Sequence, residues 1–252
     1  MGVKPSISVG DSFVNRQGCS YTVVDYKGAL EVTIKFDDDS GYTAVHRSYN
    51  VKNGGVKNPM HPSIFGVGFF GDGTYPASTN GRSTAAYAAW FNMMIRCYCD
   101  KFQQKDPSYI GCSVHSDWHN FQNFAEWYYS HDNYNDGYQL DKDLLKIGNK
   151  VYSAVNCSLI PLEINSLIVN PNRKNKELPV GVDFYKKRGL FRARLSINST
   201  SKEIGFFETA REAELAYINA RNARISAMAN KWRGKISSEA YNALLNRIKA
   251  YE

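Results

Sequence analysis

The chain has 252 residues, of which 43% are hydrophobic, and it carries a formal net charge of +7. This length allows one large domain or two to three small ones, and this hydrophobic content excludes a chain that is disordered throughout. No run approaches the roughly 18 apolar residues of a membrane-spanning helix, so we expect no membrane partner.

The five cysteines and the first residues bear on the cellular compartment. An odd number of cysteines without paired spacing predicts reduced thiols, and therefore neither a disulfide framework nor a structural zinc site. No signal-peptide pattern is visible at the start. We therefore expect a cytoplasmic protein.

The positive charge is concentrated in the last third of the chain. Residues 166–252 contain 17 Lys and Arg against 8 Asp and Glu, a net +9, whereas residues 1–165 contain 14 against 16, a net −2. A basic end on a near-neutral body favours a polyanionic partner for that end. Solvated helix faces are the alternative interpretation.

Residues 1–62 are predicted to form a small β-barrel-like domain. Tyr21–Tyr26 alternates in hydrophobicity, Val32–Phe36 reads as a strand, and short strands at this spacing indicate a small barrel or a curled sheet. The three carboxylates Asp37–Asp39 are interpreted as a solvated turn, because no second ligand cluster flanks them. Such a domain could serve as a protein-interaction module.

Residues 63–168 begin with glycines at the spacing of a dinucleotide-binding motif, Gly66 to Gly71. A turn follows them and no helix opens, so we reject nucleotide binding and expect a flexible linker or a buried glycine turn. Aromatic residues at helical spacing predict helices over 83–102 and 114–129.

The segment 140–165 is predicted as a strand, a polar turn, a second strand and a helix. Asp141 precedes Lys142, Asn156 follows, and Asn165 comes nine residues later. This resembles the ββα-metal core of the HNH endonuclease superfamily, in the form found in phage homing-type enzymes. In that family the segment reads hydrophobic-Asp-His, a turn rich in Gly and Asn, Asn-hydrophobic, and a final Asn or His. Lys142 stands where the family has its His.

The resemblance implies a one-metal site for phosphodiester hydrolysis. Asp141, Asp143 and Asn165 would hold Mg²⁺ or Mn²⁺ through oxygen ligands, and Asp141, Lys142 and Asn156 stand at catalytic positions. A His would accept a proton from the attacking water, whereas a lysine is protonated at neutral pH and is a poor base. Lys142 could still bind phosphate as a point charge. Slow nicking, a nuclease-inactive fold kept for DNA binding, and a plain surface hairpin all stay open.

A polar, basic stretch at 169–176 is expected to be an exposed boundary, and residues 178–228 follow it. Phe191–Leu195 alternates, which places Phe191, Ala193 and Leu195 on one face of a strand and Arg192, Arg194 and Ser196 on the other. Thr209 and Glu212 form a capping box that opens a helix.

This region resembles the DNA-binding domain of plant ethylene-response factors, a domain shared with phage homing endonucleases. The resemblance implies a three-stranded sheet packed on one helix, with the sheet entering the major groove. The tryptophans of the plant sheet are absent, so base preference cannot be transferred. Arg192 and Arg194 are the candidates for reading bases, since arginine binds guanine edges bidentately. The expected DNA-binding residues are Lys186, Lys187, Arg188, Arg192, Arg194, Ser196 and Lys202.

Together these patterns predict an α+β protein with a β-barrel-like domain at 1–62, an HNH-like ββα domain at 63–168 and an ethylene-response-factor-like domain at 177–252. We expect a double-stranded DNA-binding protein of the phage HNH endonuclease type, with Mg²⁺- or Mn²⁺-dependent nicking that is slow at most. The alternative is a nuclease-dead regulator or interference factor of phage origin. Either would act in the cytoplasm of a bacterial host.

Overall fold

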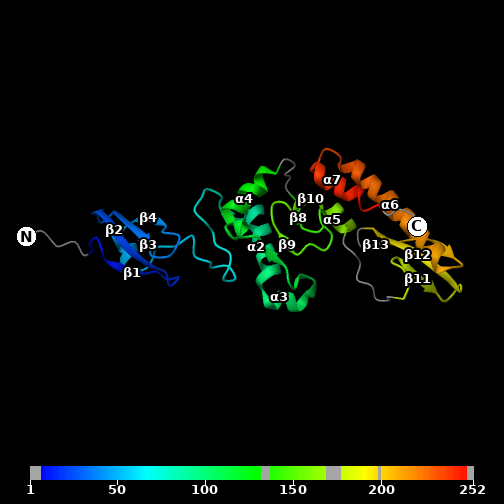
Figure 1. The fold of residues 1–252 in the computed structure, drawn as a ribbon, viewed down its shortest axis with the longest axis horizontal. Helices are drawn as coiled ribbons and strands as arrows, with labels where there is room; N and C mark the ends of the chain where they lie inside the picture. Colours follow the sequence, from blue (N-terminus) through cyan, green and yellow to red (C-terminus); the bar gives the residue numbers. More distant parts are fainter. Residues whose placement is uncertain (1–6, 132–136, 169–176, 198–199, 249–252) are drawn as a thin grey trace, which may run out of the picture. The chain divides into compact units, whose positions relative to one another are not determined.

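The protein has a mixed α+β architecture in a computed structural model that describes residues 7–131, 137–168, 177–197 and 200–248 (Figure 1). The chain divides into two compact units, residues 1–126 and 127–252, and each is described by itself. In these described ranges, no helix has both the length and the apolar character needed to span a bilayer.

The N-terminal strands form an open antiparallel sheet of order β1-β2-β3-β4. These strands are β1 (Ser12–Val14), β2 (Ser20–Gly28), β3 (Glu31–Phe36) and β4 (Thr43–His46). The expected barrel is therefore wrong: among the described residues, β1 and β4 pair with one neighbour each, and closure would require these two edges to pair. The short helix α1 (Ser48–Lys52) follows, and one cluster fills the core: Ile7, Tyr21, Val23, Val32, Ile34, Phe36, Val51 and Val56.

The rest of the first unit is helical, with short pairings between the helices. Its elements are β5 (Ser78–Thr79), β6 (Arg82–Ser83), α2 (Ala85–Tyr98), α3 (Asp100–Lys105), η1 (Pro107–Tyr109), β7 (Ser113–Val114), η2 (Ser116–His119) and α4 (Phe121–Ser130). The helix expected over 83–102 is interrupted at Cys99, and the one expected over 114–129 begins only at Phe121, because Cys99 and Asn120 have extended backbones.

The glycine-rich stretch begins at an exposed residue, Gly66, and turns so that Gly68 and Gly71 are buried. A Cβ atom on Gly68 would lie 2.7 Å from the Met94 side chain, and one on Gly71, whose φ is +79°, would lie 1.9 Å from the Asn120 amide oxygen. The glycines are therefore required for close packing of the backbone against side chains. No helix follows Gly71 until α2, as expected from the sequence.

The second unit contains the segments 140–165 and 178–228 (Figure 1). Its elements are β8 (Gln139–Asp141), β9 (Val151–Tyr152), β10 (Ser158–Ile160), α5 (Leu162–Ile168), β11 (Val182–Tyr185), β12 (Leu190–Ile197), β13 (Thr200–Phe207), α6 (Ala210–Trp232) and α7 (Ser238–Leu245). Over 140–165 the chain forms β8, β9, β10 and α5, so the expected order of strand, turn, strand and helix contains one further two-residue strand, β9. Strand β8 pairs antiparallel with β10.

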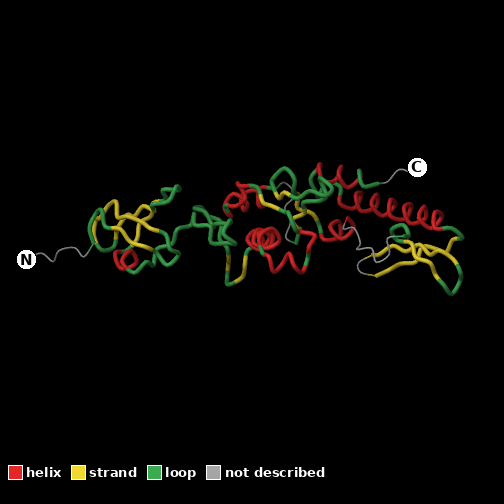
Figure 2. The backbone as a smooth tube through the Cα atoms, turned by 60° about the horizontal axis from the view of Figure 1, so that its bottom comes forward, coloured by secondary structure: helices red, strands yellow, loops and turns green. Residues whose placement is uncertain are grey.

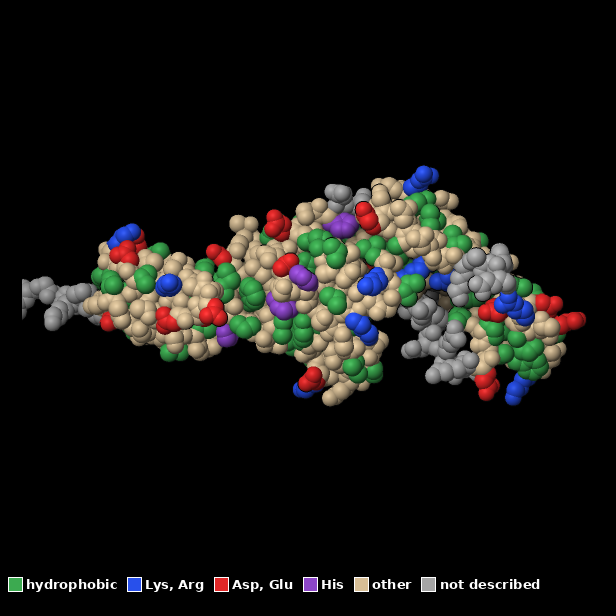
Figure 3. All heavy atoms as spheres, viewed as in Figure 1, with side chains coloured by type: hydrophobic (Ala, Val, Ile, Leu, Met, Phe, Trp, Pro, Cys, Tyr) green, Lys and Arg blue, Asp and Glu red, His purple; other side chains and the backbone are tan. Residues whose placement is uncertain are grey.

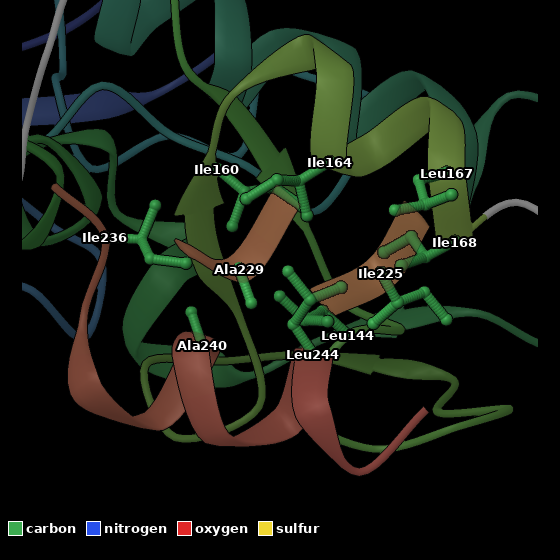
Figure 4. Packing of buried hydrophobic residues seen from close by; sticks show 10 residues of the cluster. All are labelled: Leu144, Ile160, Ile164, Leu167, Ile168, Ile225, Ala229, Ile236, Ala240 and Leu244. Carbon is green, nitrogen blue, oxygen red and sulfur yellow. The ribbon is translucent and has the colours of Figure 1, made fainter. Parts of the chain in front are cut away.

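Helix α6 packs against two different parts of this unit. Near its N-terminus it lies along β12 and β13, and Figure 2 shows this long helix beside the three strands. Near its C-terminus, Ile225 and Ala229 enter a core with β10, α5 and α7 (Figure 4). That core consists of Leu144, Ile160, Ile164, Leu167, Ile168, Ile225, Ala229, Ile236, Ala240 and Leu244. The regions before and after 169–176, a stretch outside the described residues, therefore share one core.

Candidate nucleic-acid interface

The three-stranded sheet β11-β12-β13 has one face against α6 and one face outward. Residues directly opposite in an antiparallel pair lie on the same face. Ala193, which is fully buried, pairs with Val182 and Gly205, whereas Arg192 pairs with Asp183 and Phe206. The alternation predicted for β12 therefore holds at Ala193 and Arg192. An irregularity in the β12–β13 register follows Ala193, and Arg194 then lies opposite Glu203.

A carboxylate ties the two arginines of the outer face together. Asp183 Oδ2 lies 2.8 Å from Arg192 Nη2, and Asp183 Oδ1 accepts from Arg192 Nε at 3.3 Å and lies 2.9 Å from Arg194 Nε. Burial opposes ionisation of Asp183, but the bonds and charges of the two arginines outweigh it and hold the pKa of Asp183 below its ordinary value. Asp183 is thus an anion at neutral pH between two arginine side chains.

Aromatic rings underlie the arginines of this face. The guanidinium carbon of Arg192 lies 4.6 Å from the centre of the Tyr185 ring, and that of Arg188 lies 4.1 Å from the Phe206 ring. The Tyr185 and Phe206 rings are 5.3 Å apart. Distances below about 6 Å are typical of cation–π contacts. Tyr185 and Phe206 therefore supply aromatic surface on a sheet that lacks the plant tryptophans.

The other residues expected to touch DNA have varied positions. Lys186, Lys187 and Arg188 are exposed in the turn between β11 and β12. Ser196 is exposed on β12, and its carbonyl oxygen accepts a bond of 2.7 Å from Arg224. Lys202 pairs with Leu195 across β12 and β13, so the pairing places it on the face opposite the arginines. In Figure 3 basic and acidic side chains are mixed on the surface around β11, β12 and β13.

The segment 140–165 holds its acidic residues in local bonds. Asp141, which is 9% exposed, accepts hydrogen bonds through Oδ1 from the backbone N–H groups of Asp143 and Leu144. Burial raises the pKa of Asp141, the Leu144 bond opposes this, and the charge of Asp143 adds to the rise. Asp141 therefore fixes the start of the turn that follows β8.

Lys142 is enclosed by oxygen atoms. Its Nζ donates to Asp143 Oδ1 and Oδ2 at 2.9 and 2.8 Å and to the carbonyl oxygen of Asn149 at 2.9 Å. The residue is 8% exposed. An ammonium group has three donors, so these contacts account for all of them and leave none for a phosphate.

The two expected asparagines also make local contacts. Asn156 Nδ2 donates to the carbonyl of Val151 at 3.4 Å, and Asn165 Nδ2 donates to Gln139 Oε1 at 2.6 Å. Asp141 is therefore bonded to the backbone of Asp143 and Leu144, the Asp143 carboxylate to Lys142, and Asn165 to Gln139. Among the residues that the structure describes, no group of three or more His, Cys, Asp and Glu side chains could hold a metal ion.

Four residues not singled out in the sequence take part in these sites. Asp183 and Tyr185 organise the arginines of the sheet, as described above. Asn149 donates from Nδ2 to the carbonyls of Lys142 and Val151 at 3.1 and 2.7 Å, and Arg247 donates to the carbonyls of Asp143 and Leu144. The turn signal Gly148-Asn149 could have indicated Asn149. Nothing in the sequence near Arg247 indicates a contact with a turn some hundred residues earlier.

Comparisons of this chain with protein-family models, with curated proteins and with solved structures give no match. Its function is therefore inferred from its own residues.

Proposed function

We propose that this protein binds double-stranded DNA through the outer face of β11-β12-β13. The observation that carries this proposal is the pair of arginines Arg192 and Arg194, which lie on one face of the sheet and both contact Asp183. The net +9 of residues 166–252, with 17 basic against 8 acidic residues, supplies the long-range attraction to a polyanion.

The chemistry of this face suits the major groove. A groove about 12 Å wide admits a β-ribbon, and arginine is the side chain that most often reads guanine there. Lys186, Lys187 and Arg188, in the exposed β11–β12 turn, would contact phosphates beside the groove. Lys202, on the opposite face, would contribute to the general field rather than to the groove.

We propose further that the segment 140–165 cleaves DNA slowly or not at all. The resemblance to the HNH core rests on Asp141, Asn156 and Asn165, which favour a nickase. The contacts of Lys142 favour the nuclease-dead alternative, because its Nζ is engaged by the Asp143 carboxylate and the Asn149 carbonyl and is not available to an attacking water. A DNA-binding regulator or interference factor is the function that this observation supports best.

The test of DNA binding is a titration of a fluorescent duplex with the full-length protein at several salt concentrations. We expect affinity to fall steeply with salt, with a slope close to the number of phosphates neutralised. The double variant Lys186→Ala/Lys187→Ala should weaken binding to every sequence and reduce the slope by about 2. The matched control Lys101→Ala/Lys105→Ala removes two exposed lysines of the first unit and should leave both unchanged. Absence of binding in low salt, or an equal loss in both double variants, would contradict the proposal.

A further inference from the structure

We infer that Asp183 is a positioning residue that presents Arg194, and not Arg192, to a guanine base in the major groove. This inference rests on the proposed DNA binding and assigns different roles to two arginines that the sequence does not distinguish. It follows from how each guanidinium is held, how exposed each side chain is, and which nitrogen atoms remain free.

The guanidinium of Arg192 is turned toward the protein. It makes a two-point contact with Asp183, through Nε at 3.3 Å and Nη2 at 2.8 Å, and its Nη1 lies 4.0 Å from Glu203. It also lies over the Tyr185 ring, and its side chain is 20% exposed. A base could engage this group only by displacing a bidentate ion pair, which is among the stronger contacts at a protein surface. Arg192 therefore anchors Asp183.

Arg194 is held at one point only. Its Nε lies 2.9 Å from Asp183 Oδ1, its side chain is 42% exposed, and within the described part of the chain its two Nη groups have no acceptor. A guanidinium has five donors in a fixed plane, so an Nε engaged by Asp183 leaves the edge that carries the Nη donors for another partner. That edge matches the N7 and O6 acceptors of guanine. Asp183 thereby restricts the rotamers of a long and flexible side chain.

An acidic residue on a DNA-facing surface has a cost as well as a benefit. Its charge repels phosphates, so Asp183 should lower affinity for duplexes of every sequence while raising discrimination for one base. A residue with only a structural role would not change these two quantities in opposite directions. The experiment therefore measures two quantities in each variant: the affinity for an unselected duplex and the discrimination for the selected base.

The experiment uses the full-length protein and a duplex library with a randomised centre. Binding sites are first selected with the wild type. Dissociation constants are then measured for three kinds of duplex: a selected one, the same one with 7-deazaguanine or adenine in place of the selected guanine, and an unselected one. We expect a selected guanine whose replacement weakens wild-type binding by roughly 5- to 150-fold, the discrimination of one bidentate arginine–guanine pair. Arg194→Ala should lose this discrimination.

The Asp183→Ala variant decides the role of the carboxylate. It should lose most of the discrimination and bind the unselected duplex more tightly than the wild type does. Asp183→Asn keeps the shape and one acceptor oxygen, so it should retain an intermediate discrimination. Glu208→Ala removes another exposed acid from the end of β13 and should leave the discrimination intact. Thermal unfolding of each variant identifies any that is not folded, and the 7-deazaguanine measurement on the wild type requires no variant.

Each remaining outcome overturns a definite part of the inference. If Asp183→Ala keeps the full discrimination, Asp183 does not position Arg194. If Arg192→Ala loses the discrimination and Arg194→Ala does not, then Arg192 is the arginine that reads the guanine. Wild-type binding without a selected guanine overturns this inference but leaves the proposed DNA binding in place. Absence of binding to any duplex overturns both.

Discussion

The ammonium group of Lys142 lies 2.9 and 2.8 Å from the two carboxylate oxygens of Asp143, its neighbour in the chain. The carbonyl oxygen of Asn149 completes the set at 2.9 Å, and Asn149 in turn donates to the carbonyl of Lys142. The lysine therefore links the two ends of the turn after β8, at Asp143 and Asn149, through its buried ammonium group. Its role in the folded protein is that of a structural cation, and this determines what its replacement should do.

Replacing Lys142 should destabilise the protein. Lys142→Met retains most of the apolar stem but leaves the Asn149 carbonyl without its donor, which should cost about 1–3 kcal/mol. Asp143 is 46% exposed and can be solvated, so no larger loss is expected. The control is Lys146→Met, an exposed lysine of the same turn, which should change stability by less than about 0.5 kcal/mol. Urea unfolding measures both, and equal stabilities would show that the enclosed ammonium makes no net contribution.

Cleavage of supercoiled plasmid should be slow at most in the wild type, and it should require Mg²⁺ or Mn²⁺. Lys142→His supplies a base near neutral pH and should raise nicking by roughly 10²–10⁴-fold, provided the variant stays folded. Asp141→Ala should abolish whatever activity exists. Gel analysis of nicked and linear products measures the rates. Fast cutting that survives Asp141→Ala would place the active site elsewhere, and no cutting by any variant would leave DNA binding as the only role of this segment.

The pH dependence of stability should change when Asp141 loses its charge. Burial raises the pKa of Asp141 above its ordinary value of about 3.9, so the folded state binds this proton more tightly than the unfolded state does. Stability from this group is therefore greatest at low pH and falls as pH rises through the raised pKa. Asp141→Asn keeps the acceptor for both backbone N–H groups and should gain stability relative to the wild type from about pH 4 upward. Urea unfolding of both proteins across this range measures the difference, and a difference that is constant or declines with pH would contradict the expectation.

The fragment that folds should be 127–252 rather than 177–252. Ile225 and Ala229 of α6 and Leu244 of α7 pack on Ile160 and Ile164, which the shorter fragment lacks. Burial of a side chain such as Ile225 or Leu244 contributes about 1.5–3 kcal/mol, so losing the partners of both removes a large part of the roughly 5 kcal/mol at the low end of domain stability. Circular dichroism during heating should show a cooperative transition for 127–252 and none for 177–252. A shorter fragment that melts cooperatively at the same temperature would show that the shared core is dispensable.

The sequence predicted those features that depend on local periodicity. The alternation of β12 was enough to assign Ala193 and Arg192 to opposite faces, and the capping box of Thr209 and Glu212 gave the start of α6 correctly. Asp183 was not predicted, because its role depends on the register that places it opposite Arg192. The barrel expected at the N-terminus was wrong, since strand spacing indicates how many strands form but not whether the edges meet.

The enclosed state of Lys142 shows a second limit. Its burial depends on Asn149, seven residues later, and on the turn that Arg247 fixes from beyond α7. Contacts over such separations leave no periodic signal in the sequence. The sequence identified the position as a departure from the expected histidine but could not show that three oxygen atoms surround it.

Helix α6 has 23 residues, so at 1.5 Å per residue it is about 35 Å long, close to one turn of duplex DNA. One end of it lies along the arginine-bearing sheet and the other packs with β10 and α5, so one continuous helix joins the two. If the segment 140–165 does cut, the nick should fall at one constant number of base pairs from the bound guanine, without the spread that a hinged nuclease would give.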